Sequence, residues 1–380
     1  LFAPAVVDLE QGGATLDEPA AAQGADVPTT MPGVLRARAV TTSHGIIGHL
    51  RIFTFNVDDP VAFRDEFVRL AGLLPQGGLV VDVRDNGGGH IYASECTLQT
   101  LTPRRIVPEP VQFIGTPLNT LICRRHAGNP TGQIDLGPWS ESLEQTVETG
   151  SVFSAAHPIT PVDVANDIGQ TYQGPAVLIT DARCYSATDI FAAGWADHQI
   201  GPILGVDDNT GAGGANVWTH GLLTALMALP TPEPASPYRE LPQGANMRVS
   251  IRRTLRVGAR SGTPVEDLGI QPHHRHLMTR DDLLADNVDL LERAAELLAG
   301  MPVHRVGVTA TRDASGALTA VIEGTGVDRA DVILDGRPRA SVDLGATPET
   351  VTVPSVAAGQ HLRVEGYAAG QLVAAQTLTT

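Results

Sequence analysis

Two short apolar runs, each followed by a turn of small residues and a helical pattern, most constrain how this chain can fold. The first is GLVVDVR at 78–84, which leads into DNGGGH, and the second is GPAVLIT at 174–180, which leads into DARCYS. Nearly continuous runs of aliphatic and β-branched residues are typical of strands buried on both faces of a parallel sheet. The sequence therefore predicts an α/β fold built around such a sheet.

Other segments supply elements around these two strands. Strands are expected at 45–55 and 201–206, and helices at 58–74, 91–101 and 187–198. The order strand, helix, strand implies right-handed crossovers between parallel strands. Reactive groups are then expected where strands end and helices begin.

The two ends of the chain have sequence patterns that differ from that of the central α/β segment. Residues 1–33 are rich in Gly, Pro and Ala without periodicity, which indicates an irregular arm or linker. Residues 280–299 predict one amphipathic helix that closes a core domain spanning 34–300. Residues 301–380 alternate apolar and polar residues between Gly, Asp and Pro turns, and six to seven short strands there predict a small immunoglobulin-like β-sandwich.

Composition argues against several function classes. All 26 basic residues are Arg and none is Lys, and the net charge of −16 disfavours nucleic acid and anionic membranes as partners. No apolar run reaches the roughly 18 residues of a membrane span, and the N-terminus lacks a signal-peptide pattern.

The cysteines indicate no cofactor chemistry. Cys96, Cys123 and Cys184 are odd in number and show no CxxC spacing, so buried free thiols are expected rather than disulfides or a metal site. Free thiols favour a cytoplasmic location over a secreted or periplasmic one, although the terminal sandwich is compatible with secretion. Homo-oligomerisation stays open, and no cofactor is expected.

Ser186 lies at the turn before the helix expected at 187–198 and allows two interpretations. A hydroxyl at a helix N-terminus can cap unpaired N–H groups, or it can face a substrate beside an anion-stabilising site. The three glycines at 87–89 favour the second interpretation, because backbone N–H groups there can approach a ligand closely, as an oxyanion hole requires. A tight turn alone would also account for them.

Four segments in order resemble the core of the C-terminal-processing, or tail-specific, serine proteases. They are GLVVDVRDNGGG, GPAVLITDARCYSATDIFAAGWAD, GVDDNTGAGGANV and VEDLGIQP, within residues 34–299. Relatives of that family include the tricorn core protease and retinoid-binding modules of the photoreceptor matrix. The resemblance implies a ClpP/crotonase-like spiral of ββα units, without the PDZ domain that family members usually carry.

The resemblance also implies roles for residues. Ser186 aligns with the nucleophile of a serine endopeptidase that cleaves polypeptides through an acyl-enzyme, and the N–H groups around Gly88, Gly89 and Ala187 take the oxyanion role. One branch of the family uses a lysine base near the T-x-G turn, where this chain has Gly213 and no lysine anywhere. A histidine base of the tricorn-like kind is expected instead.

Several histidines are candidates for that base. Ser43-His44 reproduces the serine–histidine dipeptide of the tricorn-like arrangement, and Glu266 aligns with its supporting glutamate. His90 follows the glycine turn, and His220 is a weaker candidate. His198 is excluded, because it lies about 18 Å along the helix from Ser186 at 1.5 Å per residue.

The sequence also contains a histidine cluster and allows two alternative functions. The histidines of QPHHRH at 271–276 lack a carboxylate motif and are expected in a polar loop rather than at a metal. A non-catalytic ligand- or peptide-binding module on the same scaffold is an alternative function, because the lysine is missing. An esterase or acyl hydrolase is another, because the same nucleophile and oxyanion hole serve both reactions.

Overall fold

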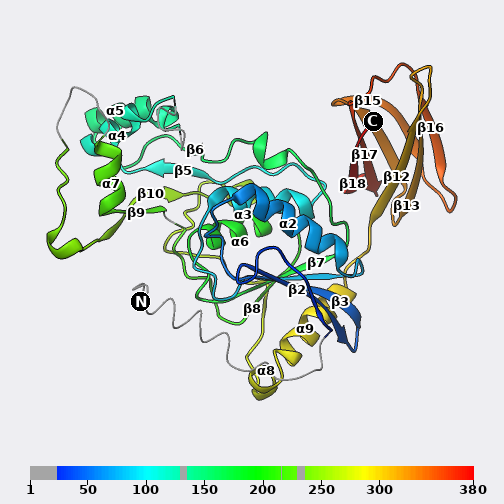
Figure 1. The fold of residues 1–380 in the computed structure, drawn as a ribbon, viewed down its shortest axis with the longest axis horizontal. Coiled ribbons are helices and arrows are strands. Elements are labelled where there is room, and N and C mark those ends of the chain that lie inside the picture. The colour runs from blue at the N-terminus through cyan, green and yellow to red at the C-terminus, as the bar shows by residue number, and fades with distance from the viewer. Residues whose placement is uncertain (1–23, 129–134, 215, 229–235) are drawn as a thin grey trace.

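The computed structural model of this chain describes residues 24–128, 135–214, 216–228 and 236–380 (Figure 1). It is a mixed α/β structure with one large sheet, one smaller sheet, and two antiparallel sheets at the C-terminal end. The arm predicted at 1–33 lies outside the described residues as far as residue 23. Its remainder includes a two-residue strand, β1 (Asp26–Val27).

A seven-stranded sheet forms the centre of the molecule. Its spatial order is β1, β2 (Leu35–Thr42), β3 (Gly45–Ile52), β4 (Leu79–Asp82), β7 (Ala176–Thr180), β8 (Ile203–Gly205) and β11 (His274–Arg275). The first three strands pair antiparallel, whereas β3, β4, β7, β8 and β11 pair parallel. Every residue of β4 and β7 is buried, which confirms the parallel, doubly covered strands predicted from the apolar runs.

Helices cover both faces of this sheet (Figure 1). On one face lie α2 (Pro60–Leu73), α3 (Ile91–Leu98) and α6 (Ala187–Asp197), which share an apolar core with β2, β3, β4 and β7. On the other face, α9 (Val288–Ala299) packs on alternate residues of the same strands. The carboxyl ends of β4 and β7 thus lead into α3 and α6 on one side of the sheet.

The single helix predicted over 280–299 is wrong, because two helices occupy this range. They are α8 (Arg280–Leu284) and α9, separated by Ala285, Asp286 and Asn287, and the last two have φ of 54° and 64°. Asp282 stabilises the break: it completes a capping box with Thr279 and accepts a hydrogen bond at 2.7 Å from the Leu290 N–H. The polar residues within the apolar pattern therefore act as caps.

A second sheet projects from the core (Figure 1). Its antiparallel strands are β6 (His157–Pro158), β5 (Pro110–Phe113), β10 (Arg248–Thr254) and β9 (Asn216–Thr219). The associated helices are α4 (Pro117–Arg125), α5 (Gly137–Thr149) and α7 (His220–Met227). Their apolar residues form a separate core around Phe113, Trp139 and Trp218.

The C-terminal residues form two antiparallel sheets. One contains β12 (Arg305–Arg312), β13 (Leu318–Thr325) and β16 (Glu349–Val353); the other contains β15 (Arg337–Asp343), β14 (Arg329–Leu334), β17 (His361–Ala368) and β18 (Gln371–Thr379). Alternate residues of both sheets share one apolar core. Gln173 joins this unit to the rest of the chain, since its side chain exchanges hydrogen bonds with the Val306 backbone at 2.8 and 3.0 Å.

Short 3-10 helices complete the described secondary structure: η2 (Gln99–Leu101), η3 (Val164–Asn166), η4 (Pro242–Gly244) and η5 (Gly258–Arg260). The three cysteines are free and buried, which confirms that prediction. Within the described ranges, no helix combines the length and apolar character needed to cross a membrane.

Candidate active site

Asn86 holds the glycine turn that follows β4. Its buried side chain accepts a hydrogen bond at 2.9 Å from the Gly88 N–H and donates one at 3.2 Å to the Ile52 carbonyl. The Asn86 carbonyl accepts a hydrogen bond at 3.1 Å from the Tyr185 N–H. This one residue therefore connects the glycine turn with the end of β3 and with the turn before α6.

Ser186 lies between β7 and α6 in a conformation that residues with a β-carbon rarely adopt. Its φ is 57° and its ψ −120°. The Ser186 N–H donates to the Gly213 carbonyl and its own carbonyl accepts from the Ile190 N–H, both at 3.1 Å. Although Ser186 occupies the N-cap position, its hydroxyl makes no capping hydrogen bond. Among the described residues the oxygen therefore has no capping role, and it lies at a helix end that favours negative charge.

The glycine turn and the serine turn lie against each other. A β-carbon on Gly88 would stand 2.7 Å from Ser186 Cβ and 2.9 Å from the Ala187 nitrogen. Gly88 and Gly89 have φ of 98° and 144°, which residues with side chains avoid. The structure thus brings together the serine and the glycines named from the sequence, and only glycine fits at the contact.

Two backbone N–H groups remain as candidate oxyanion donors. Within the described residues, neither the Gly89 nor the Ala187 N–H donates a hydrogen bond, whereas the Gly88 N–H is used by Asn86. Ala187 is the first residue of α6, where N–H groups lack intrahelical partners. Gly88 therefore acts by allowing the close approach, and Gly89 and Ala187 offer the free donors.

Asp189 connects Ser186 with the glycine-rich turn at 211–214. It is fully buried in α6, and its carboxylate accepts hydrogen bonds from the Thr210 hydroxyl at 2.6 Å and from the Gly213 N–H at 2.9 Å. Burial raises the pKa of Asp189 to about 6, against the lowering effect of these bonds. This role could not be predicted from the sequence, because Asp189 occupies a position in the pattern that is typical of an ordinary helix interior.

The Tyr185 ring lies on that glycine turn. A β-carbon on either Gly211 or Gly213 would overlap the ring. Gly213 is the position where the resemblance places the lysine base of other family members. The space that a longer side chain would need there is therefore occupied by an aromatic ring.

Glu266 lies beside the same turn. Its Oε1 accepts a hydrogen bond at 2.6 Å from the Thr254 N–H, whereas Oε2 is buried without a partner among the described residues. Burial raises the pKa of Glu266 to about 7. The next residue, Asp267, donates its N–H to the Ala212 carbonyl at 3.2 Å. The structure thus places Glu266 next to the turn that contacts Ser186.

Ser43 and His44 lie at the opposite end of the sheet from Ser186. They form the turn between β2 and β3, where the Ser43 hydroxyl donates to Glu292 at 2.7 Å and His44 is exposed. This turn precedes the eight residues of β3, a length of about 25 Å at roughly 3.3 Å per residue. Ser186 follows the opposite, carboxyl end of the parallel strand β7. The structure therefore does not bring His44 to Ser186, because the dipeptide belongs to a hairpin.

The other histidines differ in their partners. The His220 ring bonds to the Arg239 carbonyl at 2.5 Å, His273 accepts from the Ile203 N–H at 3.0 Å, and His276 pairs with Asp282 at 2.6 Å. His90 directly follows Gly89 and is exposed, and its ring has no hydrogen-bond partner among the described residues.

Neither a base at Ser186 nor a metal site is found among the described residues. In the part of the chain that the structure describes, no histidine is hydrogen-bonded to the Ser186 hydroxyl. Across the same residues, no group of three His, Cys, Asp or Glu side chains is arranged to hold a metal ion.

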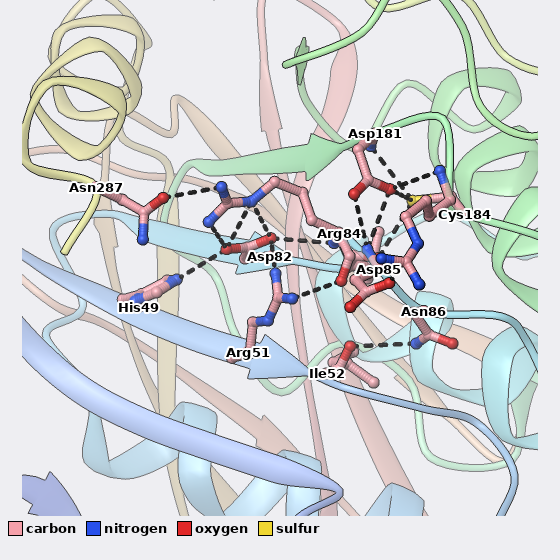
Figure 2. A network of polar contacts seen from close by, with 12 residues as sticks. His49, Arg51, Ile52, Asp82, Arg84, Asp85, Asn86, Asp181, Cys184 and Asn287 are labelled. Atoms are coloured by element: carbon pink, nitrogen blue, oxygen red, sulfur yellow. Dashed lines mark hydrogen bonds and ion pairs between the residues drawn. The ribbon is translucent and has the colours of Figure 1, made fainter. Parts of the chain in front are cut away.

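Behind the glycine turn, a buried carboxylate at the end of β4 binds one arginine from β3 and another from the residues that follow β4 (Figure 2). Asp82 accepts hydrogen bonds from Arg51 and from Arg84, and His49 lies 3.4 Å from it. Burial alone would raise the pKa of Asp82, but the two guanidinium groups hold it well below its usual range. This network fixes the backbone at the point where β4 enters the glycine turn.

The family is settled by the sequence between β3 and β11. Residues 46–275 match the model of peptidase family S41, which is more than half of the chain. The chain belongs to peptidase family S41. Its membership agrees with the resemblance to C-terminal-processing proteases found in the ordered motifs, three of which carry Asn86, Ser186 and Glu266.

Solved structures share the fold of this S41 chain. Mature CPAF aligns with a TM-score of 0.51 at 16% identity, and mature CPAF complexed with lactacystin aligns with a TM-score of 0.50 at 15% identity. Each alignment covers 77% of this chain and 62% of the other, so the S41 chain spans less than two thirds of those proteins. No curated protein matches the chain.

Proposed function

We propose that this S41 chain is a serine endopeptidase whose nucleophile is Ser186. The observation that carries the proposal is the strained turn at the N-terminus of α6, where Ser186 lies against Gly88 through its Cβ and its hydroxyl makes no capping hydrogen bond. The hydroxyl oxygen attacks a peptide carbonyl, the amine leaves with a proton, and water releases the acyl-enzyme. The Gly89 and Ala187 N–H groups hold the tetrahedral oxyanion.

A histidine takes the proton from Ser186 in this proposal. His90 replaces His44 as the candidate, because His90 follows Gly89 and its ring is unpartnered among the described residues. Glu266 keeps a supporting role, since its partly ionised carboxyl beside the 211–214 turn adds negative charge near the site. In this proposal the His90 ring comes within hydrogen-bond reach of the Ser186 hydroxyl, as a general base must.

The decisive experiment compares the wild-type chain with Ser186→Ala. We expect the wild type to cleave an unstructured polypeptide and to be labelled by a fluorophosphonate, and the variant to lose both by at least about a thousandfold. A circular dichroism spectrum controls for folding. Equal cleavage and labelling by the two proteins would refute the proposal, and ester substrates run in parallel separate a peptidase from an acyl hydrolase.

A non-catalytic binding module is the second candidate. Two observations favour it. In the described residues, no imidazole is hydrogen-bonded to Ser186, and Tyr185 occupies the space of the family's lysine. Such a protein would bind an unstructured peptide with equal affinity before and after Ser186→Ala. It would show no time-dependent labelling.

The finer architecture is also part of our proposal. We propose that residues 34–300 form a ClpP/crotonase-like spiral of ββα units and that residues 301–380 form an immunoglobulin-like sandwich. The parallel strands with α3 and α6 on one face, and the two antiparallel sheets with a common core, support these assignments. Limited proteolysis of the full chain should then cut preferentially near residue 301. Cuts inside either unit at the same rate would contradict this division.

A further inference from the structure

Asp189 is a buried carboxylate next to the turn that carries Ser186. It lies in the first turn of α6 and is fully buried. In the part of the chain that the structure describes, its oxygens accept hydrogen bonds, and no cation pairs with the carboxylate. Burying a charge without a counter-charge is costly, and groups of this kind gather at functional sites.

Gly213 connects Asp189 with Ser186. The Gly213 N–H donates to the Asp189 carboxylate at 2.9 Å, and the Gly213 carbonyl accepts from the Ser186 N–H at 3.1 Å. The Ser186 carbonyl in turn accepts from the Ile190 N–H at 3.1 Å, within α6. These bonds form a closed ring that begins at α6, passes through the facing turn and returns to α6 at the serine.

Both turns of this ring contain strained backbone. Ser186 has a φ of 57° and a ψ of −120°, and Ala212, the residue before Gly213, has a φ of 58°. Residues with a β-carbon adopt such values only where the surrounding structure enforces them. An ionised acceptor forms hydrogen bonds roughly twice as strong as a neutral one. The charge of Asp189 is therefore suited to maintaining the strained turns.

Thr210 holds the other oxygen of the carboxylate. Its buried hydroxyl donates to Asp189 at 2.6 Å and accepts from the Ile270 N–H at 2.8 Å. The Thr210 N–H also donates to the Ile270 carbonyl at 3.1 Å. Asp189 is thus fixed to a segment outside α6, so that its bond to Gly213 has a rigid origin.

We propose that Asp189 is a positioning residue for the nucleophile: its ionised carboxylate, acting through Gly213, holds Ser186 in the strained conformation that attack requires. The role rests on the proposed function, because it concerns the reactivity of Ser186. Among the described residues, the groups that bind the carboxylate are the Thr210 hydroxyl and backbone N–H groups, so Asp189 acts through the backbone and not on the serine oxygen.

Protonation of Asp189 should weaken this hold, because the carboxyl keeps an acceptor oxygen but loses its charge. Burial raises the pKa of Asp189 to about 6. Burial also raises the pKa of the Cys184 thiol well above its usual range, so the thiol stays neutral. The titratable groups that border the two turns are Cys184 and Tyr185 before Ser186, and Glu266 and Asp267 beside the 211–214 turn.

The test compares the rate constants of fluorophosphonate labelling of the wild type and of Asp189→Asn across the pH range. Asparagine has the shape of the protonated carboxyl and carries no charge at any pH. We expect the wild type to react at least about tenfold faster at about pH 8 and no more than about threefold faster at about pH 5. The histidine base and Glu266 titrate in both proteins, so their effects cancel in the ratio. A ratio that does not change with pH would overturn the proposal.

Thr188→Val is the matched control in the same helical turn. Thr188 is fully buried, and its hydroxyl has no hydrogen-bond partner among the described residues. Valine keeps the shape of the side chain, so this variant should be labelled like the wild type at every pH.

A second pair of variants tests the role of Asp189 without changing the residue itself. Thr210→Val removes a hydrogen bond that lowers the pKa of Asp189, so the fall in labelling on acidification should begin at a higher pH than in the wild type. Thr210→Ser keeps the hydroxyl and should restore the wild-type profile. The same pH profile for both variants would contradict the role of the carboxylate charge.

Hydrogen exchange separates this inference from the proposed function, because it does not require catalysis. At about pH 8, the Ser186 N–H should exchange at least about threefold faster in Asp189→Asn than in the wild type. An unchanged exchange rate would overturn the hold on Ser186 even where labelling is rapid. Absence of labelling in the wild type, together with faster exchange in the variant, would refute the proposed function and still support the hold through Gly213.

Discussion

Gly88 lies against Ser186 so closely that a β-carbon on the glycine would stand 2.7 Å from the serine Cβ. The contact joins the turns after β4 and β7, which are far apart in the sequence and adjacent in the sheet. A peptidase site at this place depends on both turns keeping their backbone conformations.

Gly88→Ala should damage the site. The new methyl group would meet the Tyr185 carbonyl as well as Ser186, and a φ of 98° is unfavourable for alanine. We expect a loss of about 2 kcal/mol in the free energy of unfolding and at least a hundredfold slower labelling of Ser186. Urea titrations and fluorophosphonate kinetics measure the two effects.

Gly87→Ala is the matched control for that variant. A β-carbon on Gly87 would meet nothing within 4 Å, and the residue does not have a positive φ in the range that disfavours alanine. The control should therefore label at nearly the wild-type rate. If both alanine variants lost activity equally, the specific contact with Ser186 would not be the cause.

Gly213 and Tyr185 should show strong energetic coupling. Gly213→Ala would push a methyl group into the Tyr185 ring and should cost about 2 kcal/mol of stability. Tyr185→Ala removes the obstacle, so the second substitution should cost much less in that background. A double-mutant cycle of unfolding free energies measures the coupling. Additive effects would show that the ring is not held against the turn in solution.

His90→Ala should slow labelling of Ser186 at least about a hundredfold, which is the usual scale for loss of a general base. The His90 side chain makes no capping bond to α3, so the variant should fold normally. His44→Ala should label like the wild type, because His44 is exposed in the β2–β3 turn. The reverse result, in which only His44→Ala is inactive, would support His44 and not His90 as the general base.

The sequence was sufficient where a short pattern determines the local structure. Continuous apolar runs predicted the buried parallel strands β4 and β7, because few other environments accommodate such residues. The glycine turn and Ser186 could be placed at the carboxyl ends of those strands for the same reason. Their contact through Gly88 follows from the pairing of β4 with β7.

Other features depend on contacts between distant segments. Ser43-His44 matched a catalytic dipeptide by composition, but hairpin pairing of β2 with β3 places it at the other end of the sheet. The range 280–299 forms two helices and not the single one predicted, because Asp282 accepts a hydrogen bond from the Leu290 N–H in the first turn of α9. Hydrophobic periodicity does not reveal such a cap. The buried role of Asp189 depends on Thr210, whose neighbourhood only the tertiary structure shows.

Two buried glutamates, Glu95 within α3 and Glu109 directly before β5, should make stability depend on pH. The Glu95 carboxylate accepts the Glu109 N–H at 3.2 Å, yet Glu95 Oε2 and Glu109 Oε1 have no partner among the described residues. Burial raises the pKa of Glu95 to about 8. Burial, and then repulsion from Glu95 and Asp197, raises the pKa of Glu109 well above its usual range.

Because these pKa values are higher in the folded state than in the unfolded chain, the folded protein binds more protons between about pH 4.5 and pH 8. Its free energy of unfolding should therefore fall as the pH rises through this window. Glu95→Gln keeps an oxygen for the Glu109 N–H and removes one titrating group, so its stability should decline less steeply and exceed that of the wild type at pH 9. Urea unfolding at pH 5, 7 and 9 measures the slopes, with exposed Glu141→Gln as the control. Parallel curves for wild type and Glu95→Gln would show that the buried pair does not titrate in this range.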